Sequence, residues 1–474
     1  MRAASVVTTL VLAVVAAACT ARNGAFLCFS DEECVLAGAH GTCEQTGFCS
    51  FADPSCAGGN RYGDYAGDGL GGRCVPGPGD HDGGPDQPDA TPLPECGTIG
   101  DNCCTSGVDC LGTLECVNGT CGCAAAGKPT AGAYAHHSCA IEDNGSAWCW
   151  GSNSQGQIGA GDQGNPHRRP VAVADLTSVS MVAPGGTHTC AIAAGEVWCW
   201  GDNDAGQLGS NGGDRTKPKK AGLTGATWID TGGATTCAVV GGEVHCWGRN
   251  QYGQVGDGTT SDRNKPKLVP NLSGVVAVSA GVTTSCALRN DFTVWCWGDG
   301  LEGQLGNGLG AASLVPVQAT LGDVAQIAAG DDQVCARTNG GLVYCWGDNE
   351  AGVIGDGTTF QRRLPTPVMG LTRVEEIDVA DEFACALKSD GTVWCWGRNN
   401  VGQLGMGHTS PFETLPQQVV GLNDATAIAT GADHACARRA VGAIVCWGSS
   451  NDGQLGDDST TSHLEPTPVQ LDCP

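Results

Sequence analysis

The sequence predicts an all-β repeat protein preceded by small disulfide-rich modules. Three observations predict it. The tripeptide Cys-Trp-Gly occurs seven times between residues 149 and 448, each copy follows an earlier cysteine by nine or ten residues, and the chain holds 29 cysteines. A repeat of roughly 50 residues is typical of a propeller, a solenoid or an array. The interval therefore fixes the class of architecture before any single residue is interpreted.

The first residues have the pattern of an export signal. Met1-Arg2 is followed by an apolar run from Val6 to Val15 and then by three alanines and Cys19. That run is too short to span a bilayer as a mature helix. The segment resembles a bacterial lipoprotein signal, in which Cys19 is lipidated; ordinary cleavage after Ala18 is the alternative. We expect residues 1–18 to be removed and the chain to be anchored at the bacterial cell envelope, at the outer membrane or the cell surface, or to be secreted.

Cysteine content and charge restrict the function classes. Dense cysteine is favourable in an oxidising compartment and unfavourable in the cytosol. No Cys-x-x-Cys pair faces a second Cys or His pair at zinc-finger spacing, so we expect disulfides, no metal and no cofactor. The net charge of -26 argues against a nucleic-acid partner, because affinity for phosphates comes from clustered Lys and Arg.

Composition divides the rest of the chain into four parts. Residues 19–74 and 96–123 are cysteine-rich modules with few large apolar residues, so cross-links must replace a core there. Residues 75–95 are rich in Pro, Gly and Asp and predict a solvated linker. Residues 124–474 hold the regular repeats. The disulfide pairing within residues 28–121 stays open.

Each repeat predicts a β-hairpin with a cross-strand disulfide. The turn Gly241-Gly242 sets Cys237 directly opposite Cys246, and directly opposed residues lie within disulfide range. The ten-residue hairpins keep this register with a longer loop. Small buried hydrophobes are the alternative role for these cysteines. The predicted pairs are Cys139–Cys149, Cys190–Cys199, Cys237–Cys246, Cys286–Cys296, Cys335–Cys345, Cys385–Cys395 and Cys436–Cys446.

The residues around the cysteines predict how the repeats pack. An alanine follows each first cysteine and faces a mostly large residue, for example Trp148 or Tyr344, which is how cross-strand pairs fill a packed face. One tryptophan per repeat, from Trp150 to Trp447, favours a core between repeats over a carbohydrate-binding platform. The Gly-Gln-Leu-Gly that follows supplies a turn and one buried apolar residue.

At these residues the chain resembles the regulator of chromosome condensation repeat family. Residues 385–405 carry the family pattern almost whole, and six other copies carry it with substitutions. The resemblance implies a seven-bladed β-propeller. It also implies guanine-nucleotide exchange on a Ran-type GTPase as one activity, which fits poorly with an exported acidic chain. A bacterial secreted β-lactamase inhibitor built on a similar propeller makes an enzyme inhibitor a second alternative.

The same family resemblance leads us to expect ring closure by the chain ends. Pro170-Val171 stands twenty residues before Cys190, and Pro468-Val469 is the equivalent pair at the C-terminus. We therefore expect the C-terminal segment to be the outer strand of the first blade. That alignment brings Cys473 near Cys123, and we expect a Cys123–Cys473 disulfide that locks the ring.

Basic residues gather after Gly-Gln-Leu-Gly in four repeats and predict a basic arc on one side of the ring. They are Arg168, Arg169, Arg215, Lys217, Lys219, Lys220, Arg263, Lys265, Lys267, Arg362 and Arg363. An anionic polysaccharide, lipid head group or acidic protein would fit such an arc. The alternative is that edge strands carry Lys and Arg to prevent pairing with other edges.

No enzyme motif accompanies the repeats. Nucleophile-elbow, zinc-protease and dinucleotide patterns do not occur, and a paired cysteine is not a nucleophile. His137, His188 and His434 each precede a hairpin cysteine by two residues and are interpreted as packing residues of the repeat. We expect no catalytic residue. The predicted function is a monomeric, non-enzymatic platform that binds a protein or an anionic glycan and contacts the membrane through its lipid anchor alone.

Overall fold

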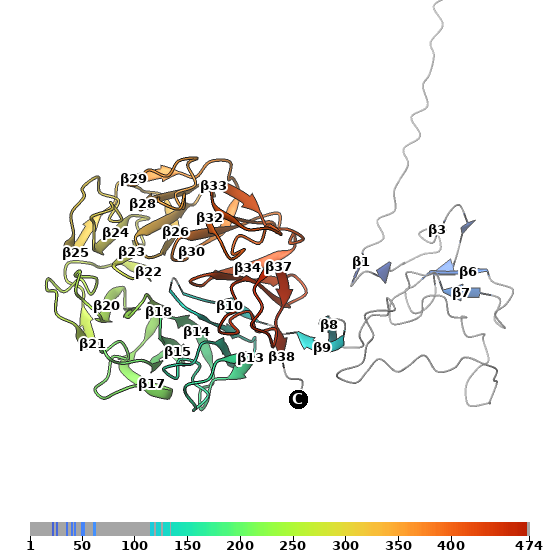
Figure 1. The fold of residues 1–474 in the computed structure, drawn as a ribbon, viewed down its shortest axis with the longest axis horizontal. Coiled ribbons are helices and arrows are strands. Elements are labelled where there is room, and N and C mark those ends of the chain that lie inside the picture. The colour runs from blue at the N-terminus through green and yellow to red at the C-terminus, as the bar shows by residue number, and fades with distance from the viewer. Residues whose placement is uncertain are drawn as a thin grey trace, which may run out of the picture. The chain divides into compact units, whose positions relative to one another are not determined.

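The fold of the repeat region is a closed ring of seven four-stranded antiparallel sheets (Figure 1). The structure is a computed structural model. It describes residues 127–132 and 134–471, together with the backbone of short strands between Ala21 and Ala124. No helix among these residues is long and apolar enough to cross a bilayer. The predicted all-β class and the seven-bladed propeller are confirmed.

Each blade uses four consecutive strands, numbered here from the inner strand outward. Blade 1 contains β10 (Lys128–Thr130), β11 (His137–Ile141), β12 (Ala147–Gly151) and β13 (His167–Ala172). Blade 2 contains β14 (Val179–Pro184), β15 (His188–Ala193), β16 (Glu196–Gly201) and β17 (Arg215–Thr224). Blade 3 contains β18 (Ala226–Thr231), β19 (Thr235–Val240), β20 (Glu243–Gly248) and β21 (Arg263–Leu268).

The remaining blades repeat this plan. Blade 4 contains β22 (Val275–Ala280), β23 (Thr284–Arg289), β24 (Val294–Gly298) and β25 (Ser313–Gln318). Blade 5 contains β26 (Val324–Ala329), β27 (Gln333–Thr338), β28 (Val343–Gly347) and β29 (Arg362–Pro367). Blade 6 contains β30 (Val374–Val379), β31 (Phe383–Lys388), β32 (Val393–Asn399) and β33 (Ser410–Gln418). Blade 7 contains β34 (Ala425–Thr430), β35 (His434–Arg439), β36 (Ile444–Gly448) and β37 (His463–Pro468).

Short strands occur outside the blades. In the unit formed by Met1–Leu93 they are β1 (Ala21–Arg22), β2 (Ala25–Phe26), β3 (Val35–Leu36), β4 (Ala39–His40), β5 (Thr42–Cys43), β6 (Cys49–Ala52) and β7 (Asn60–Tyr62). In the unit that holds the propeller they are β8 (Leu114–Val117), β9 (Thr120–Ala124) and β38 (Gln470–Leu471). The predicted signal, the linker and Cys19 lie outside the described residues.

The hairpin register agrees with the sequence prediction in every blade. Cys237 is opposite Cys246, Ala238 opposite His245 and Val240 opposite Glu243. The longer hairpins keep the register, with Cys286 opposite Cys296. In all seven hairpins the two sulfur atoms lie 2.04–2.13 Å apart, which is disulfide bonding distance. Each pair therefore links the two middle strands of its own blade.

Tryptophans fill the space between blades, as the sequence predicted. Each tryptophan of Cys-Trp-Gly is fully buried, and Trp200 of blade 2 packs with Ile158 and both cysteines of blade 1. Its Nε1 donates to the backbone carbonyl of Gln157, at 2.8 Å. The same bond recurs around the ring at 2.7–3.0 Å, always to the loop of the preceding blade. At every blade boundary the indole side chain is thus both buried and hydrogen-bonded through its N–H.

The ring closes differently from the prediction. Pro170-Val171 lies in β13, which pairs with β12, so it belongs to blade 1 and not to blade 2. In the same way, β37 pairs with β36 and is the outer strand of blade 7. The inner strand of blade 1 is β10. The predicted exchange of the C-terminal strand into the first blade was therefore wrong. Each outer strand follows its own hairpin, and each of the seven blades is built from one continuous stretch of the chain.

Blades 7 and 1 meet through the same contacts as any other pair of blades. Val469 packs against Trp150 just as Val173 packs near Trp200, and Trp150 Nε1 donates to the carbonyl of Gln454 at 2.9 Å. Beyond β37 the chain forms β38, which pairs with β9 and sets Leu471 opposite Cys123. Cys473 lies outside the described residues, so the Cys123–Cys473 disulfide stays a prediction.

Candidate binding surface

All eleven predicted basic residues lie on outer strands, at the rim of the ring (Figure 1). They belong to β13, β17, β21 and β29, in blades 1, 2, 3 and 5. The outer strand of each blade has no further strand beside it. The fold therefore brings these residues to equivalent positions, as the sequence predicted, but it also supplies many of them with acidic partners.

Five of the eleven cations form salt bridges. Two of the partners are distant in sequence and are brought close by the fold: Lys217 contacts Asp175 at 3.0 Å and Arg169 contacts Asp458 at 2.9 Å. The other pairs are Lys220–Glu196, Arg263–Asp257 and Arg362–Asp356. The arc is therefore less positive than its residue list implies, because each pair is locally neutral.

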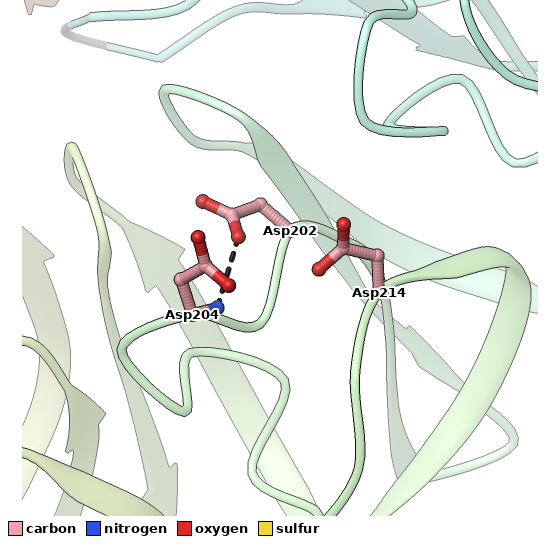
Figure 2. A group of neighbouring side chains, drawn as sticks. All are labelled: Asp202, Asp204 and Asp214. Atoms are coloured by element: carbon pink, nitrogen blue, oxygen red, sulfur yellow. Dashed lines mark hydrogen bonds between the residues drawn. The ribbon is translucent and has the colours of Figure 1, made fainter.

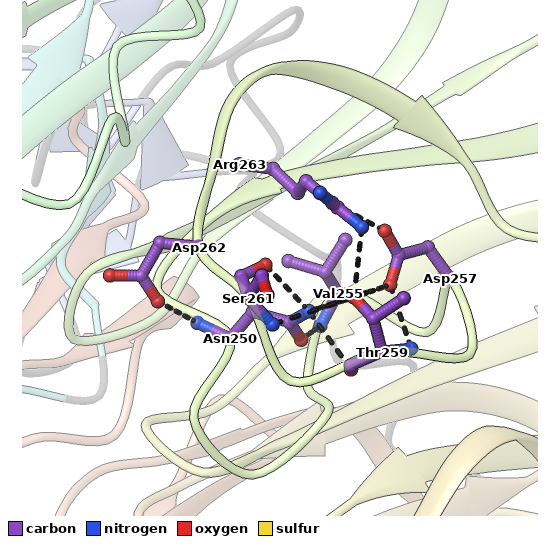
Figure 3. A network of polar contacts seen from close by, with 7 residues as sticks. All are labelled: Asn250, Val255, Asp257, Thr259, Ser261, Asp262 and Arg263. Atoms are coloured by element: carbon purple, nitrogen blue, oxygen red, sulfur yellow. Dashed lines mark hydrogen bonds and ion pairs between the residues drawn. The ribbon is translucent and has the colours of Figure 1, made fainter.

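Arg263 is an example of a cation whose contacts hold its own loop together (Figure 3). It contacts Asp257 and donates to Thr259 Oγ1 at 2.9 Å. Partial burial acts to raise the pKa of Asp257, but hydrogen bonds from Thr259 and Arg263 together hold that pKa below its usual value. Asn250 completes the network: its Oδ1 accepts the N–H of Val255 at 2.9 Å. The side chains thus hold the loop between the third and fourth strands.

Sequence reasoning missed this role of the asparagine. In five blades the Asn two residues after Cys-Trp-Gly accepts the N–H of the buried apolar residue in the next turn, at 2.9–3.2 Å. Its amide also donates to carbonyls of the following loop, as Asn250 does to Ser261 at 3.0 Å. The signal was present in the sequence as a repeated Asn at a fixed place, where an amide can both accept and donate hydrogen bonds.

Five cations of the arc are exposed and have no salt bridge among the residues that the structure describes. They are Arg168, Lys219, Lys265, Lys267 and Arg363. Their positive charge stands on a chain of net charge -26. These residues, named here the free basic rim, are the part of the predicted arc that is available to an anionic partner.

The rim also carries exposed apolar side chains that sequence reasoning did not single out. Phe360 is 70% exposed, Leu309 62%, and Leu364 49%. They lie in blades 4 and 5, and blade 5 also carries Arg362 and Arg363 of the basic arc. Isolated exposed apolar residues are normal on a soluble protein, whereas a large contiguous set is typical of an interaction surface.

A polar pocket lies at the boundary of blades 2 and 3. Its volume is about 450 Å³, and its lining includes Asn203, Asp204, Asn211, Asp262 and Asn264. Asn264 Nδ2 donates to Asn211 Oδ1 at 3.1 Å and so joins the two walls. Amide and carboxylate groups in this number are suited to a ligand rich in hydroxyls.

Three aspartates stand beside this pocket (Figure 2). One carboxylate oxygen from each of Asp202, Asp204 and Asp214 lies within 4.8 Å of the others. Asp202 accepts the N–H of Asp204 at 2.9 Å and the hydroxyl of Thr187 at 2.9 Å, while Asp214 accepts the N–H of Asn203 at 3.0 Å. These bonds give Asp202 and Asp214 a structural role, and we base no metal site on the group.

The loops between the first and second strands are strongly acidic in blades 5 and 6. Burial and neighbouring carboxylates raise the pKa of Asp331 to about 7 and that of Asp381 to about 6. Glu382 in the same loop contacts Arg398. The carboxylate of Asp381 is among the neighbours that raise the pKa of Asp331, because two nearby carboxylates disfavour full ionisation of both.

The three histidines noted in the sequence are fully buried between blades. His137 Nε2 bonds to Thr189 Oγ1 at 2.7 Å, and that hydroxyl donates to the carbonyl of Gln157 at 2.7 Å. Because the hydroxyl proton is used there, Nε2 must carry the imidazole proton. His188 and His434 make the equivalent bonds to Thr236 and Ser138. The interpretation of these histidines as packing residues is confirmed.

The seven-bladed fold and its repeats define a class of protein: a β-propeller of the RCC1 type. A family model described as the RCC1-like domain matches residues 173–473, and one described as the regulator of chromosome condensation (RCC1) repeat matches residues 144–192. The first match covers more than half of the chain, and the chain belongs to the RCC1-like domain family.

Comparison with individual proteins adds two kinds of similarity. The human E3 ubiquitin-protein ligase HERC2 is 30% identical over 189 residues, which are 38% of this chain and 3% of the ligase. Human WBSCR16 has a TM-score of 0.63 at 22% identity, covering 69% of this chain and 94% of that one. Yeast RCC1 (Prp20), solved with bound Kap60, has a TM-score of 0.63 at 22% identity, covering 70% and 85%. The structural matches show the fold alone.

Proposed function

We propose that this chain is a non-enzymatic binding platform exported to the bacterial cell envelope, where its propeller binds a protein or an anionic glycan. The free basic rim is the observation that carries the proposal. Five exposed cations stay without a salt bridge among the described residues of a chain that has 50 acidic residues. Unpaired positive charge in such a chain favours an anionic partner.

The polar pocket supports a glycan as one ligand class. It lies between the second and third blades, which hold three of the five free cations, Lys219, Lys265 and Lys267. Amide groups in its wall suit sugar hydroxyls, and neighbouring lysines suit the acidic groups of a charged polysaccharide. A glycan chain that leaves the pocket toward the rim would meet both kinds of group.

Export is supported by the residues at the N-terminus and by the hairpin cysteines. The apolar run before Cys19 fits a lipoprotein signal, and seven cysteine pairs at bonding distance fit an oxidising compartment. Intact mass of the protein purified from membranes tests this part. We expect a chain that begins at lipid-modified Cys19, and a chain that begins at Met1 would contradict it.

Binding is tested by replacing the free basic rim. A variant with Lys219, Lys265, Lys267 and Arg363 changed to Ser should elute from heparin at lower salt and lose binding to lipopolysaccharide. The matched control changes Lys217 and Lys220 to Ser, because both are already paired with acids. Unchanged elution of the first variant would remove the anionic-partner proposal.

A partner is identified by crosslinking on whole cells, followed by capture of the propeller and analysis of what is attached. A nucleotide-exchange assay with a Ran-type GTPase and a panel of hydrolase substrates accompany it. We expect a crosslinked envelope component and no turnover. Turnover in either assay would replace the binding proposal by an enzymatic or exchange function.

A further inference from the structure

One boundary between blades is joined differently from the other six. At those six, a residue in the loop between the third and fourth strands donates its N–H to a carbonyl on the outer strand of the next blade, at 2.9–3.0 Å. The bonds are Gly161–Thr216, Gly258–Leu314, Gly308–Arg363, Gly357–Thr414, Gly407–Leu464 and Asp458–Arg168. The equivalent residues of blades 2 and 3 are Asn211 and Asn264. Although the structure describes both, no backbone hydrogen bond joins them.

Loop length accounts for this difference. In blade 2 the proline of the outer strand follows the last glycine of the Gly-Gln-Leu-Gly turn by nine positions, from Gly209 to Pro218, whereas the separation is ten or eleven in every other blade. The shorter loop does not bring its backbone to the outer strand of blade 3. A side-chain bond takes the place of the backbone bond, because Asn264 Nδ2 donates to Asn211 Oδ1 at 3.1 Å.

The polar pocket lies at this boundary, and both asparagines line it. The two blades stay packed at Gly206, another lining residue, where an added Cβ would lie 2.5 Å from Asn264 Cα. The volume of about 450 Å³ falls within the roughly 300–1,000 Å³ that is typical of small-molecule sites. The pocket therefore coincides with the boundary that lacks the backbone bond.

The pocket wall offers hydrogen-bonding groups that the fold does not use. The bridge between the asparagines leaves Asn211 Nδ2 as a donor and Asn264 Oδ1 as an acceptor, neither with a partner among the described residues. Asp262 accepts the N–H of Asn250 through Oδ1 at 2.8 Å, and its second oxygen has no such bond in the described chain. Sugar hydroxyls both donate and accept, so they match donors and acceptors that lie in one wall.

The charge of the pocket is negative. Its lining holds Asp204 and Asp262 and no basic residue, and Asp202 and Asp214 stand beside it (Figure 2). Arg215 packs on a lining glycine and donates to the carbonyl of Asp214 at 3.0 Å. Four carboxylates thus stand near one guanidinium, and this excess of negative charge favours a ligand with a positive group.

We propose that this pocket binds an amino-sugar unit of a glycan, with the ammonium group at Asp204 and Asp262 and the hydroxyls at Asn211 and Asn264. The inference rests on the proposed function of the chain as a glycan-binding platform and narrows it. An acidic sugar unit is repelled by the carboxylates of the pocket, so acidic units of the same glycan are left to the free basic rim.

Calorimetry of the full mature chain, with Cys19→Ser to prevent lipidation, tests the inference with two ligands of equal length. Chitosan tetrasaccharide carries free amines, and chitin tetrasaccharide has the same backbone with every amine acetylated. At about pH 6, where a free amine is protonated, and with EDTA present to remove metal ions, we expect the chitosan tetrasaccharide to bind at least about tenfold more tightly. Spermine, which has amines but no hydroxyls, should bind more weakly than chitosan tetrasaccharide.

Variants of the pocket locate the preference. Asp204→Asn together with Asp262→Asn should reduce the preference for chitosan tetrasaccharide to less than about twofold and leave the binding of chitin tetrasaccharide unchanged. Glu243→Gln together with Glu375→Gln is the matched control, because it removes the same charge at exposed positions outside the pocket lining. Replacing residues 210–214 by the sequence of residues 257–262 restores the missing loop position and should abolish the binding of both tetrasaccharides.

Each failure has a separate meaning. Equal affinities for the two tetrasaccharides, or an equal affinity for spermine, would overturn the amino-sugar assignment and leave the proposed glycan function standing. A preference that survives replacement of Asp204 and Asp262 would overturn it by placing the recognised amine elsewhere. Absence of binding by both tetrasaccharides would overturn it as well, and the elution of the rim variant from heparin then decides the proposed function independently.

Discussion

The boundary between blades and the outer rim follow opposite rules in this molecule. At every boundary a fully buried tryptophan donates to a carbonyl of the preceding loop, and a cysteine pair joins the two strands behind it. At the rim, the residue before the proline changes from Lys265 to Leu364 to Glu465 within one chain. Comparison of the seven repeats thus separates the residues that the fold requires from the positions at which it accepts different residues.

This difference lets candidate functional residues in a repeat protein be identified by comparing its own repeats, without the sequences of related proteins. A residue that is the same in all blades and buried is explained by packing. An exposed position that holds different residues in different blades is not explained by packing, because the other blades fold with another residue at the equivalent position. The rim is therefore the place to look for function, and substitutions at the boundary should affect stability far more than substitutions at the rim.

The largest effect is expected at a boundary tryptophan. Trp297→Ala removes a fully buried ring and leaves the carbonyl of Gln254 without its indole donor, so we expect a loss of about 3–5 kcal/mol in the free energy of unfolding. Denaturant unfolding of the oxidised protein measures it. Trp295→Ala, two residues earlier and only half-buried, is the control. Equal losses of unfolding free energy for the two variants would contradict the distinction between the blade boundary and the surface.

A hairpin disulfide should rank next. Replacing Cys237 and Cys246 together by Ala removes a cross-link that spans nine residues of sequence, for which the chain-entropy model gives about 2–3 kcal/mol. The same double replacement of Cys286 and Cys296 should cost a similar amount, because the register is the same. Urea unfolding of both variants provides the comparison. A loss as small as that of a surface substitution would show that the cysteines act only as buried hydrophobes.

The buried histidines should make the boundaries of blades 7, 1 and 2 sensitive to acid. Burial lowers the pKa of His137 to about 3 and that of His188 to about 4, below the usual 6.5. The unfolded chain therefore takes up the proton first, and stability is lost as the pH falls from about 6.5 toward those values. At pH 5 each histidine should cost about 2 kcal/mol relative to pH 7.

His137→Gln isolates this effect, because blade 5 carries Gln333 at the same position. The free energy of unfolding, measured from pH 7 to pH 5, should fall less steeply for the variant than for the parent chain. Parallel curves would mean that His137 is not a buried neutral imidazole. Thr235→Ser in blade 3 provides a control without a titratable group at the equivalent position.

The smallest effect on stability is expected at the rim. Leu364→Lys should change the free energy of unfolding by no more than about 0.5 kcal/mol, because Lys265 occupies this position in blade 3. Thermal unfolding of the variant and the parent chain measures it. A loss comparable to that of Trp297→Ala would place Leu364 in the core and contradict its use as a free surface.

Local chemistry made the blade predictable from the sequence. Gly241-Gly242 fixes a two-residue turn, and counting outward from it sets Cys237 opposite Cys246 without further information. Ring closure was not predictable in this way. Pro170-Val171 can be counted from the hairpin before it or from the hairpin after it. β10 has no cysteine or tryptophan that marks it as a strand of the first blade.

The binding surface was predictable only in part. The basic residues could be placed on equivalent outer strands because they follow the same motif. Their pairing could not, since Asp175 is 42 residues from Lys217 in sequence and 289 residues separate Arg169 from Asp458. The exposed apolar side chains of the outer strands could not be recognised, because Leu364 and Val315 look like ordinary strand residues until their exposure is known.

Peptide mapping of the native protein under non-reducing conditions, after alkylation of free thiols, tests most directly the claim that a disulfide inside each blade supports the buried core of the ring. The account predicts seven linked peptide pairs, one for each hairpin from Cys139–Cys149 to Cys436–Cys446, and no alkylated thiol among those fourteen cysteines. Alkylated thiols throughout the hairpins, or pairs that join different blades, would contradict it.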